Sequence, residues 1–131
     1  MVGSFSDYDM ISASKRFSIE FKCETTPART GNVAIEYWNT DLDAPSGILG
    51  TKANTWIHLV PKGDHLEAME LDVNRLRKLV LEESRVESNG RNSLCRIIPL
   101  ERFKAVARRC FDVQTRFMSD IMEGAASRRQ R

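Results

Sequence analysis

Two side chains with complementary chemistry lie close together near the start of the chain. Glu20 and Lys22 are separated by one residue, within a segment, 17–24, in which apolar and polar residues alternate strictly. Such alternation predicts a β-strand, whose successive side chains point to opposite faces. Glu20 and Lys22 therefore share a face, roughly 7 Å apart along the backbone. A carboxylate there can help to hold a divalent cation, and an ammonium beside it can steady a phosphate or its attacking water.

A Glu-x-Lys tripeptide is common, and taken alone it is more simply explained as a solvated ion pair on an exposed strand face. The residues around it favour the chemical interpretation. Asp9 lies eleven residues before Glu20, so an acid precedes the Glu-x-Lys.

This order resembles that of the PD-(D/E)xK nucleases, in which an acid is followed by a Glu-x-Lys. Further stretches are similar to small phage-type members of that superfamily: 19–24, 29–37, 45–48, 51–53 ahead of Trp56, and the predicted strand near 97–100 with the helix after it. The resemblance covers most of the chain and is sharpest over residues 8–60. It identifies a family type, which includes junction-resolvase-like enzymes, and no individual protein.

The resemblance implies an α/β (α+β) fold in which helices flank a central mixed β-sheet, as in restriction endonucleases. It implies that Asp9 and Glu20 bind Mg²⁺ (or Mn²⁺), that the backbone carbonyl of Phe21 is a further ligand, and that Lys22 is catalytic. The expected activity is metal-dependent endonucleolytic hydrolysis of DNA phosphodiester bonds. A catalytically inactive nuclease-fold module that binds nucleic acid or a partner protein is the alternative.

The chain departs from the family pattern before its first acid. Tyr8 stands where the motif has proline, and only eight residues precede Asp9, whereas many relatives place a helix with another acid there. We expect either a simpler site or a substitute carboxylate. Glu36 is the candidate, because a hairpin between 17–24 and 32–38 would bring its strand beside Glu20. An ordinary solvent-facing strand residue is an equally weighted explanation.

Other polar residues offer weaker signals. Thr51 and Lys52 follow a glycine-bearing turn, and with Arg29 we interpret them as substrate-binding residues that meet a phosphate. A plain surface location is the alternative for Lys52 and Arg29. Glu24 is expected to be exposed, and His58, without a partner at metal-ligand spacing, to be structural.

Elsewhere, periodicity predicts the elements that must position these residues. The pattern predicts a helical turn within 46–53 and a loop over 85–92. It predicts strands over 55–60, 66–71 and 94–100. Asp72 is a plausible N-cap for a helix over 73–84. Apolar residues spaced by three and four from 101 predict a long helix ending near Gly124.

Composition places the chain among ordinary globular proteins. It has 131 residues, 41% of them hydrophobic and 29% charged, and a net charge of +2 that alone argues nothing about nucleic acid. We expect one domain over 1–124 and a basic, disordered tail over 125–131. Three widely spaced cysteines and the lack of a long apolar run predict reduced thiols, no membrane contact and a cytoplasmic location. A homodimer is expected if paired sites cut a duplex.

Overall fold

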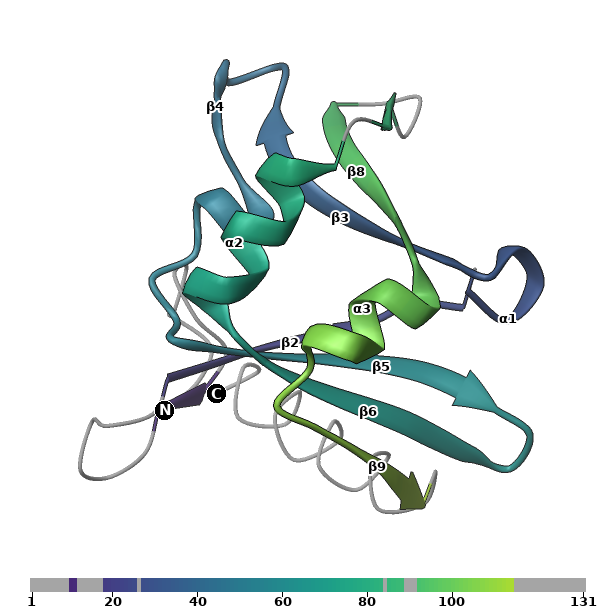
Figure 1. Cartoon of the computed structure of the whole chain (residues 1–131). Helices are drawn as coiled ribbons and strands as arrows, with labels where there is room; N and C mark the ends of the chain where they lie inside the picture. Colours follow the sequence, from purple (N-terminus) through teal and green to yellow (C-terminus); the bar gives the residue numbers. More distant parts are fainter. Residues whose placement is uncertain (1–9, 12–17, 26, 84, 89–91, 115–131) are drawn as a thin grey trace, which may run out of the picture.

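The computed structural model describes residues 10–11, 18–25, 27–83, 85–88 and 92–114. Two β-sheets form its framework (Figure 1). Across the first sheet the strands are β1 (Met10–Ile11), β2 (Ser18–Cys23), β5 (Thr55–Lys62), β6 (His65–Asp72) and β9 (Arg109–Gln114). Across the second they are β4 (Ala44–Pro45), β3 (Asn32–Asn39), β8 (Ser93–Pro99) and β7 (Val86–Ser88).

Helical segments of different length connect several of the strands. They are α1 (Pro27–Thr30), the 3-10 turn η1 (Gly47–Leu49), α2 (Val73–Glu82) and α3 (Leu100–Val106). β2 and β5 pair in parallel, whereas β1–β2, β5–β6 and β6–β9 pair antiparallel, so the first sheet is mixed. The fold class is therefore α+β with a mixed sheet, as predicted. No helix of the described residues is long and apolar enough to cross a membrane.

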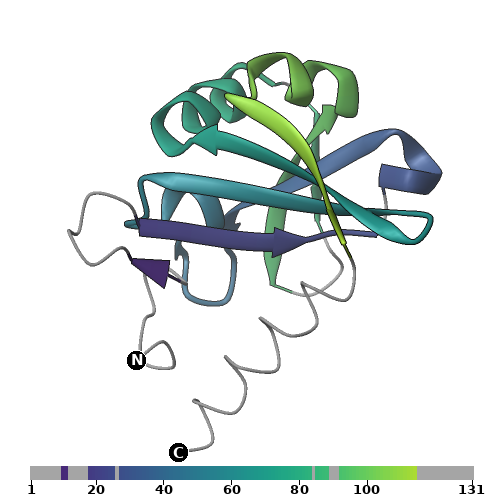
Figure 2. The same cartoon turned by 90° about the horizontal axis from the view of Figure 1, so that it is seen from below.

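The main core lies between the first sheet, the second sheet and the helices. Val33 and Ile35 from β3, Trp56 from β5, and Leu76 and Leu79 from α2 are all buried in it. Figure 2 shows β2, β5 and β6 side by side, with α2 and α3 on one side of them. The other face of the first sheet carries a second apolar cluster, to which β2 contributes through two of its side chains, Ile19 and Phe21.

β5 is the most buried strand, because it lies between β2 and β6 and packs on both faces. Six consecutive residues from Thr55 to Val60 are buried, which is typical of a central strand. β2, in contrast, packs partly buried Ile19 and Phe21 against the second cluster and turns Glu20 and Lys22 toward the second sheet. The alternation predicted for residues 17–24 is confirmed by β2.

α2 confirms the predicted helix and its N-cap. The side chain of Asp72 accepts a hydrogen bond from the backbone N–H of Arg75 at 3.1 Å, which satisfies one of the free donors of the first turn. The predicted strands at 55–60, 66–71 and 94–100 correspond to β5, β6 and β8. The turn at 46–53 contains η1.

The predicted hairpin between β2 and β3 is wrong, because the two strands lie in different sheets. β3 pairs with β4 and β8 in the second sheet, where Val33 lies opposite Ile98. The connection does not form a tight turn: it contains α1, which ends at Thr30 and is followed by Gly31 with a positive φ of 73°. Pairing with β8 places Val33, Ile35 and Ile98 in one core, all fully buried, and this burial decides the partner.

The predicted long helix from 101 is confirmed only as far as Val106, and it is wrong over residues 107–114. α3 ends at Val106, Ala107 is extended, and Arg109–Gln114 forms β9 beside β6. Phe111 and Val113 pack against the second cluster, so these apolar residues alternate as in a strand. Within the predicted loop 85–92, Val86–Ser88 forms β7, paired with β8. Residues 115–131, including the predicted tail, lie outside the described residues.

Candidate functional site

Glu20 and Lys22 lie on the face of β2 that points toward the second sheet. The parallel register places Glu20 beside Trp56 and Lys22 beside His58 on β5. Nζ of Lys22 is 3.8 Å from Oε2 of Glu20. The two side chains differ in environment, because that of Glu20 is only 14% exposed and that of Lys22 is 48% exposed. The carboxylate is therefore shielded, while the ammonium reaches solvent.

Thr51 holds the Glu20 carboxylate from a neighbouring loop. Its hydroxyl donates a hydrogen bond to Oε1 of Glu20 at 3.2 Å and accepts one from the backbone N–H of Ala53 at 3.1 Å. Thr51 is itself buried, and its backbone N–H donates to the carbonyl of Gly47 at 2.9 Å. A Cβ at Gly47, whose φ is +54°, would collide with the carbonyl oxygen of Glu36. The glycine-bearing turn thus brings this loop against β3 and sets the position of Thr51.

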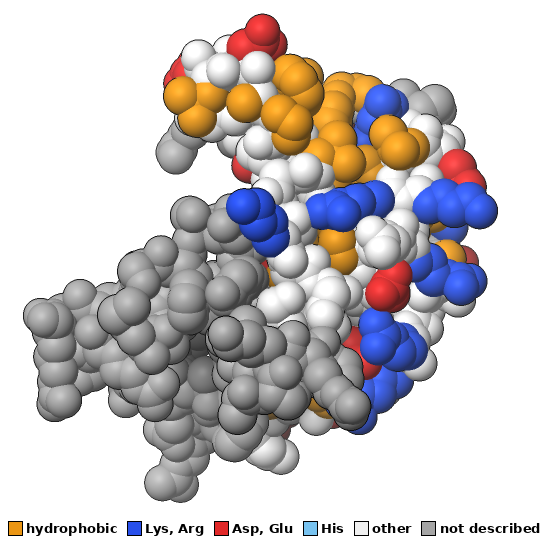
Figure 3. Space-filling view, turned by 90° about the vertical axis from the view of Figure 1, so that its left-hand side faces the viewer, with side chains coloured by type: hydrophobic (Ala, Val, Ile, Leu, Met, Phe, Trp, Pro, Cys, Tyr) orange, Lys and Arg blue, Asp and Glu red, His pale blue; other side chains and the backbone are white. Residues whose placement is uncertain are grey.

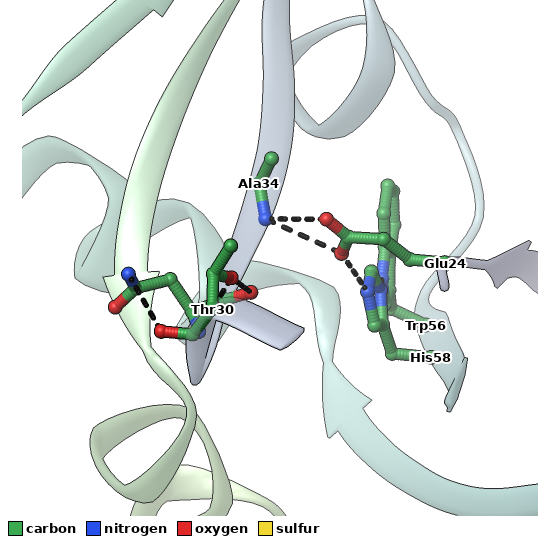
Figure 4. A network of polar contacts seen from close by, with 6 residues as sticks. Glu24, Thr30, Ala34, Trp56 and His58 are labelled. Atoms are coloured by element: carbon green, nitrogen blue, oxygen red, sulfur yellow. Dashed lines mark hydrogen bonds and ion pairs between the residues drawn. The ribbon is translucent and has the colours of Figure 1, made fainter. Parts of the chain in front are cut away.

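A second carboxylate on the same face, Glu24, connects the two sheets (Figure 4). Its oxygens accept hydrogen bonds from the backbone N–H of Ala34 at 3.1 and 3.3 Å. Oε1 also lies 2.8 Å from Nε2 of His58. Glu24 was predicted to be exposed, but its side chain is only 15% exposed, because β3 and β5 both supply hydrogen-bond donors to it.

The tautomer of His58 follows from its other neighbour. The indole N–H of Trp56 lies 3.2 Å from Nδ1 of His58, and an indole nitrogen only donates. Nδ1 must therefore accept, and Nε2 carries the proton that is donated to Glu24. With both ring nitrogens engaged and the side chain 2% exposed, His58 is placed to connect β5 with Glu24 and not to act as a general base.

Glu36 takes part in a third polar group, on the second sheet. The hydroxyl of buried Ser93 donates to Oε1 of Glu36 at 2.6 Å. Cys95 lies opposite Glu36 in the β3–β8 register. Burial, followed by the negative charges of Glu36, Glu24 and Glu87, raises the pKa of the Cys95 thiol to about 11. This thiol is consequently protonated at neutral pH.

These groups surround an open pocket of about 460 Å³ between the two sheets. Its lining includes Lys22, Glu24, Ala34, Glu36, His58 and Cys95. Although β2 and β3 belong to different sheets, the pocket brings Glu36 to the same space as Lys22. The pocket is therefore lined by the Lys22 ammonium and by the carboxylates of Glu24 and Glu36, and the shielded Glu20 lies beside Lys22.

The remaining predicted site residues are only partly brought together. Asp9 lies outside the described residues, although Met10, which follows it, pairs with Ile19, which precedes Glu20. The backbone of Phe21 lies in β2 between Glu20 and Lys22, while its side chain packs on the opposite face. Lys52 is exposed beside Thr51. Arg29 is exposed on α1, and no hydrogen bond or ion pair within the described residues joins it to Glu20 or Lys22.

The described residues alone contain no group of three or more His, Cys, Asp or Glu side chains that could hold a metal ion. A metal at Glu20 would thus take its other ligands from backbone, water, substrate or residues outside the described ranges. Mg²⁺ commonly binds in this way, through one or two carboxylates and several waters.

Sequence reasoning did not find the connections made by Glu24, Trp56, His58 and Ser93. The alternation that places Trp56 and His58 on one face of β5 was visible, but their partner was not. Glu24 and Ala34 are ten residues apart, and their contact depends on the separation of β2 and β3 into two sheets. Comparison of the chain with protein-family models, with curated proteins and with solved structures found no match.

Proposed function

We propose that this chain is a metal-dependent endonuclease of restriction-endonuclease-like architecture that hydrolyses DNA phosphodiester bonds, with Asp9, Glu20 and Lys22 at its centre. The observation that supports it is the pairing of a shielded carboxylate with a solvent-reaching ammonium on one strand face. Glu20 is fixed by the Thr51 hydroxyl, and Lys22 extends from beside it to the rim of an open pocket.

An ordinary surface ion pair explains this arrangement less well. Exposed pairs contribute little to stability, and they require no buried residue to orient the acid. Here buried Thr51 hydrogen-bonds to Glu20, and its loop is held in turn by the backbone of Gly47. Such support is what a carboxylate needs in order to keep one position when it binds a cation or a phosphate-bound water.

The donor chemistry at Glu20 suits Mg²⁺ or Mn²⁺. The proposed ligands are the carboxylates of Asp9 and Glu20 and the carbonyl of Phe21, all oxygen donors of the kind that hard cations prefer. Glu36 is a candidate for a further ligand or an outer contact. When bound, the cation would supply charge stabilisation at the phosphoryl group and lower the pKa of its water.

The chain's own groups have separate roles in this proposal. Thr51 keeps one oxygen of Glu20 in place. Lys22, half-exposed and carrying three N–H donors, binds a non-bridging phosphate oxygen or orients the attacking water. Lys52 and Arg29 are proposed to bind the backbone of the substrate, as cations do without reading its sequence.

The proposal is tested by incubating the full chain with supercoiled, linear, single-stranded and four-way-junction DNA, with and without Mg²⁺. Glu20→Gln keeps an oxygen that accepts from Thr51, and it is expected to lower cleavage about a hundredfold. Glu67→Gln is the matched control, because Glu67 is also a partly buried strand glutamate, 2.7 Å from Nζ of Lys104. Cleavage should be unchanged in this control. Binding without cleavage by the wild type would favour the inactive-module alternative.

A further inference from the structure

α2 carries a concentration of positive charge on its outward side. Between Val73 and Leu81 it contains Arg75, Arg77 and Lys78 and no acidic residue. The side of α2 that faces the core consists of Val73, Leu76, Leu79 and Val80. Arg75 and Lys78 are exposed, as is Lys52 in the neighbouring loop. We call Arg75, Arg77 and Lys78 the α2 basic face.

The charges on α2 are not neutralised in the way that many cations of this protein are. Arg85, Arg102, Lys104, Arg108 and Arg109 each lie within 4 Å of a carboxylate. Within the described ranges, Arg75 and Lys78 have no such ion pair. Arg77 bonds only to uncharged acceptors there, two backbone carbonyls and the side-chain oxygen of Asn74. The positive potential of α2 is therefore directed to solvent.

Arg77 connects this face to the proposed site. Its Nε donates to the carbonyl of Ile48 at 2.9 Å, and its Nη2 donates to the carbonyl of Thr51 at 2.6 Å. Thr51 in turn donates to Glu20. The basic face therefore begins at the loop that orients the Glu20 carboxylate. Figure 3 views the side of the molecule that carries β4 and α2, and shows Lys and Arg side chains in a row across it, below a hydrophobic area.

We propose that the α2 basic face binds the phosphate backbone of DNA beside Glu20 and Lys22. This inference takes the identity of the polyanion from the proposed function. A group of cations that form no ion pair with any described carboxylate matches the regular negative charge of a duplex, and its binding releases counterions. Phosphate contacts of this type position a duplex without reading its bases, which is what a strand-cleaving site requires of an adjoining surface.

The test measures the salt dependence of binding, which is independent of cleavage. Arg75→Gln/Lys78→Gln removes two exposed charges from α2. The control, Lys62→Gln/Arg85→Gln, also removes two positive charges, one at the end of β5 and one at the residue before β7. Affinity for a short fluorescent duplex is measured in EDTA between about 50 and about 200 mM salt, where each phosphate contact contributes about 0.9 to the slope of log K against log salt.

The α2 variant is expected to reduce this slope by about 1.8, two contacts at about 0.9 each, while the control keeps the wild-type slope. Equal slopes for the two variants, or no binding of the duplex by the wild type, would contradict the proposal that the α2 basic face binds DNA. The nuclease proposal is judged separately. If the α2 variant reduces the slope but the wild type does not cleave DNA, the α2 binding surface is retained and the nuclease proposal is rejected. If the wild type cleaves DNA but the two variants have equal slopes, the nuclease proposal is retained and the α2 binding surface is rejected.

Discussion

Nε2 of His58 lies 2.8 Å from Oε1 of Glu24, and this contact joins the centre of the first sheet to the residue that follows β2. Glu24 also accepts the backbone N–H of Ala34 on β3, so one carboxylate connects elements of both sheets. Lys22 precedes Glu24 by two residues on the same face. The connection therefore fixes the end of the strand that carries the proposed catalytic pair.

Replacing His58 should destabilise the protein. His58→Phe fills similar volume but leaves the buried indole N–H of Trp56 without its acceptor, and an unsatisfied buried group costs about 1–3 kcal/mol. Urea denaturation should show a loss of this size in the free energy of unfolding. His65→Phe is the control, because His65 lies at the β5–β6 hairpin with an exposed aspartate neighbour, and a change within about 0.5 kcal/mol is expected there. Equal losses would mean that the His58 contacts contribute nothing specific.

The Cys95 thiol should titrate at unusually high pH. Its pKa is raised from 9.0 to about 11, first by burial and then by nearby glutamates. Because the folded protein retains this proton where the unfolded chain loses it, the associated stability is present below pH 9 and is lost as pH rises toward 11. Alkylation of a Cys23→Ser/Cys110→Ser variant, followed against pH in the folded state, should have its midpoint near the higher value. A midpoint near the ordinary thiol value would contradict the environment described for Cys95.

Glu36→Gln tests whether the second sheet contributes to the site. Gln retains an oxygen to accept from Ser93, so the fold should persist, while the pocket loses one negative charge. We expect turnover or apparent affinity for the metal to fall roughly tenfold or more, the size of a lost ligand or outer contact. The measurement is cleavage by Glu36→Gln as a function of metal concentration. The control is Glu87→Gln, which alters an exposed glutamate on β7. Curves that superimpose on the wild type would make Glu36 a bystander.

Local patterns in the sequence predicted the elements that carry the site better than they predicted how those elements meet. The alternation around Glu20 and Lys22 and the N-cap at Asp72 depend on neighbours within a few residues, and both are present in the structure. The partner of β3 depends instead on whether Val33 and Ile35 bury better against β2, the preceding strand, or against β8, which is distant in sequence. The local pattern is the same in both cases.

The end of α3 shows a second kind of limit. Apolar residues at 103, 106, 107, 110 and 111 fit helical spacing, and the two at 111 and 113 fit alternation, so a short apolar run is ambiguous. Pairing with β6 selects the strand. The backbone N–H of Arg108 donates to the backbone carbonyl of Glu70 at 2.7 Å, and β9 begins at the next residue. The catalytic and metal-binding roles stay predictions, since they rest on the family resemblance.

Cleavage should depend on a divalent cation. The proposed ligands are oxygens, so Mg²⁺ or Mn²⁺ should support turnover, whereas Ca²⁺ should support DNA binding with poor turnover. The measurement is cleavage of a labelled duplex after chelation and restoration of each ion, with binding followed in parallel. Undiminished cleavage in excess EDTA would show that no bound cation takes part.

Lys22→Ala provides the most direct test of the central claim. Lys22 is half-exposed, and its one ion pair with a described residue is the 3.8 Å contact with Glu20. Its removal should therefore change stability by no more than about 1 kcal/mol and leave DNA affinity nearly intact. Loss of a group that stabilises charge at the reacting phosphate should lower turnover about a hundredfold or more. The control is Lys62→Ala, which removes another exposed strand lysine from the same sheet. The account predicts near-complete loss of Mg²⁺-dependent cleavage by Lys22→Ala and wild-type cleavage by Lys62→Ala; wild-type rates from both would contradict it.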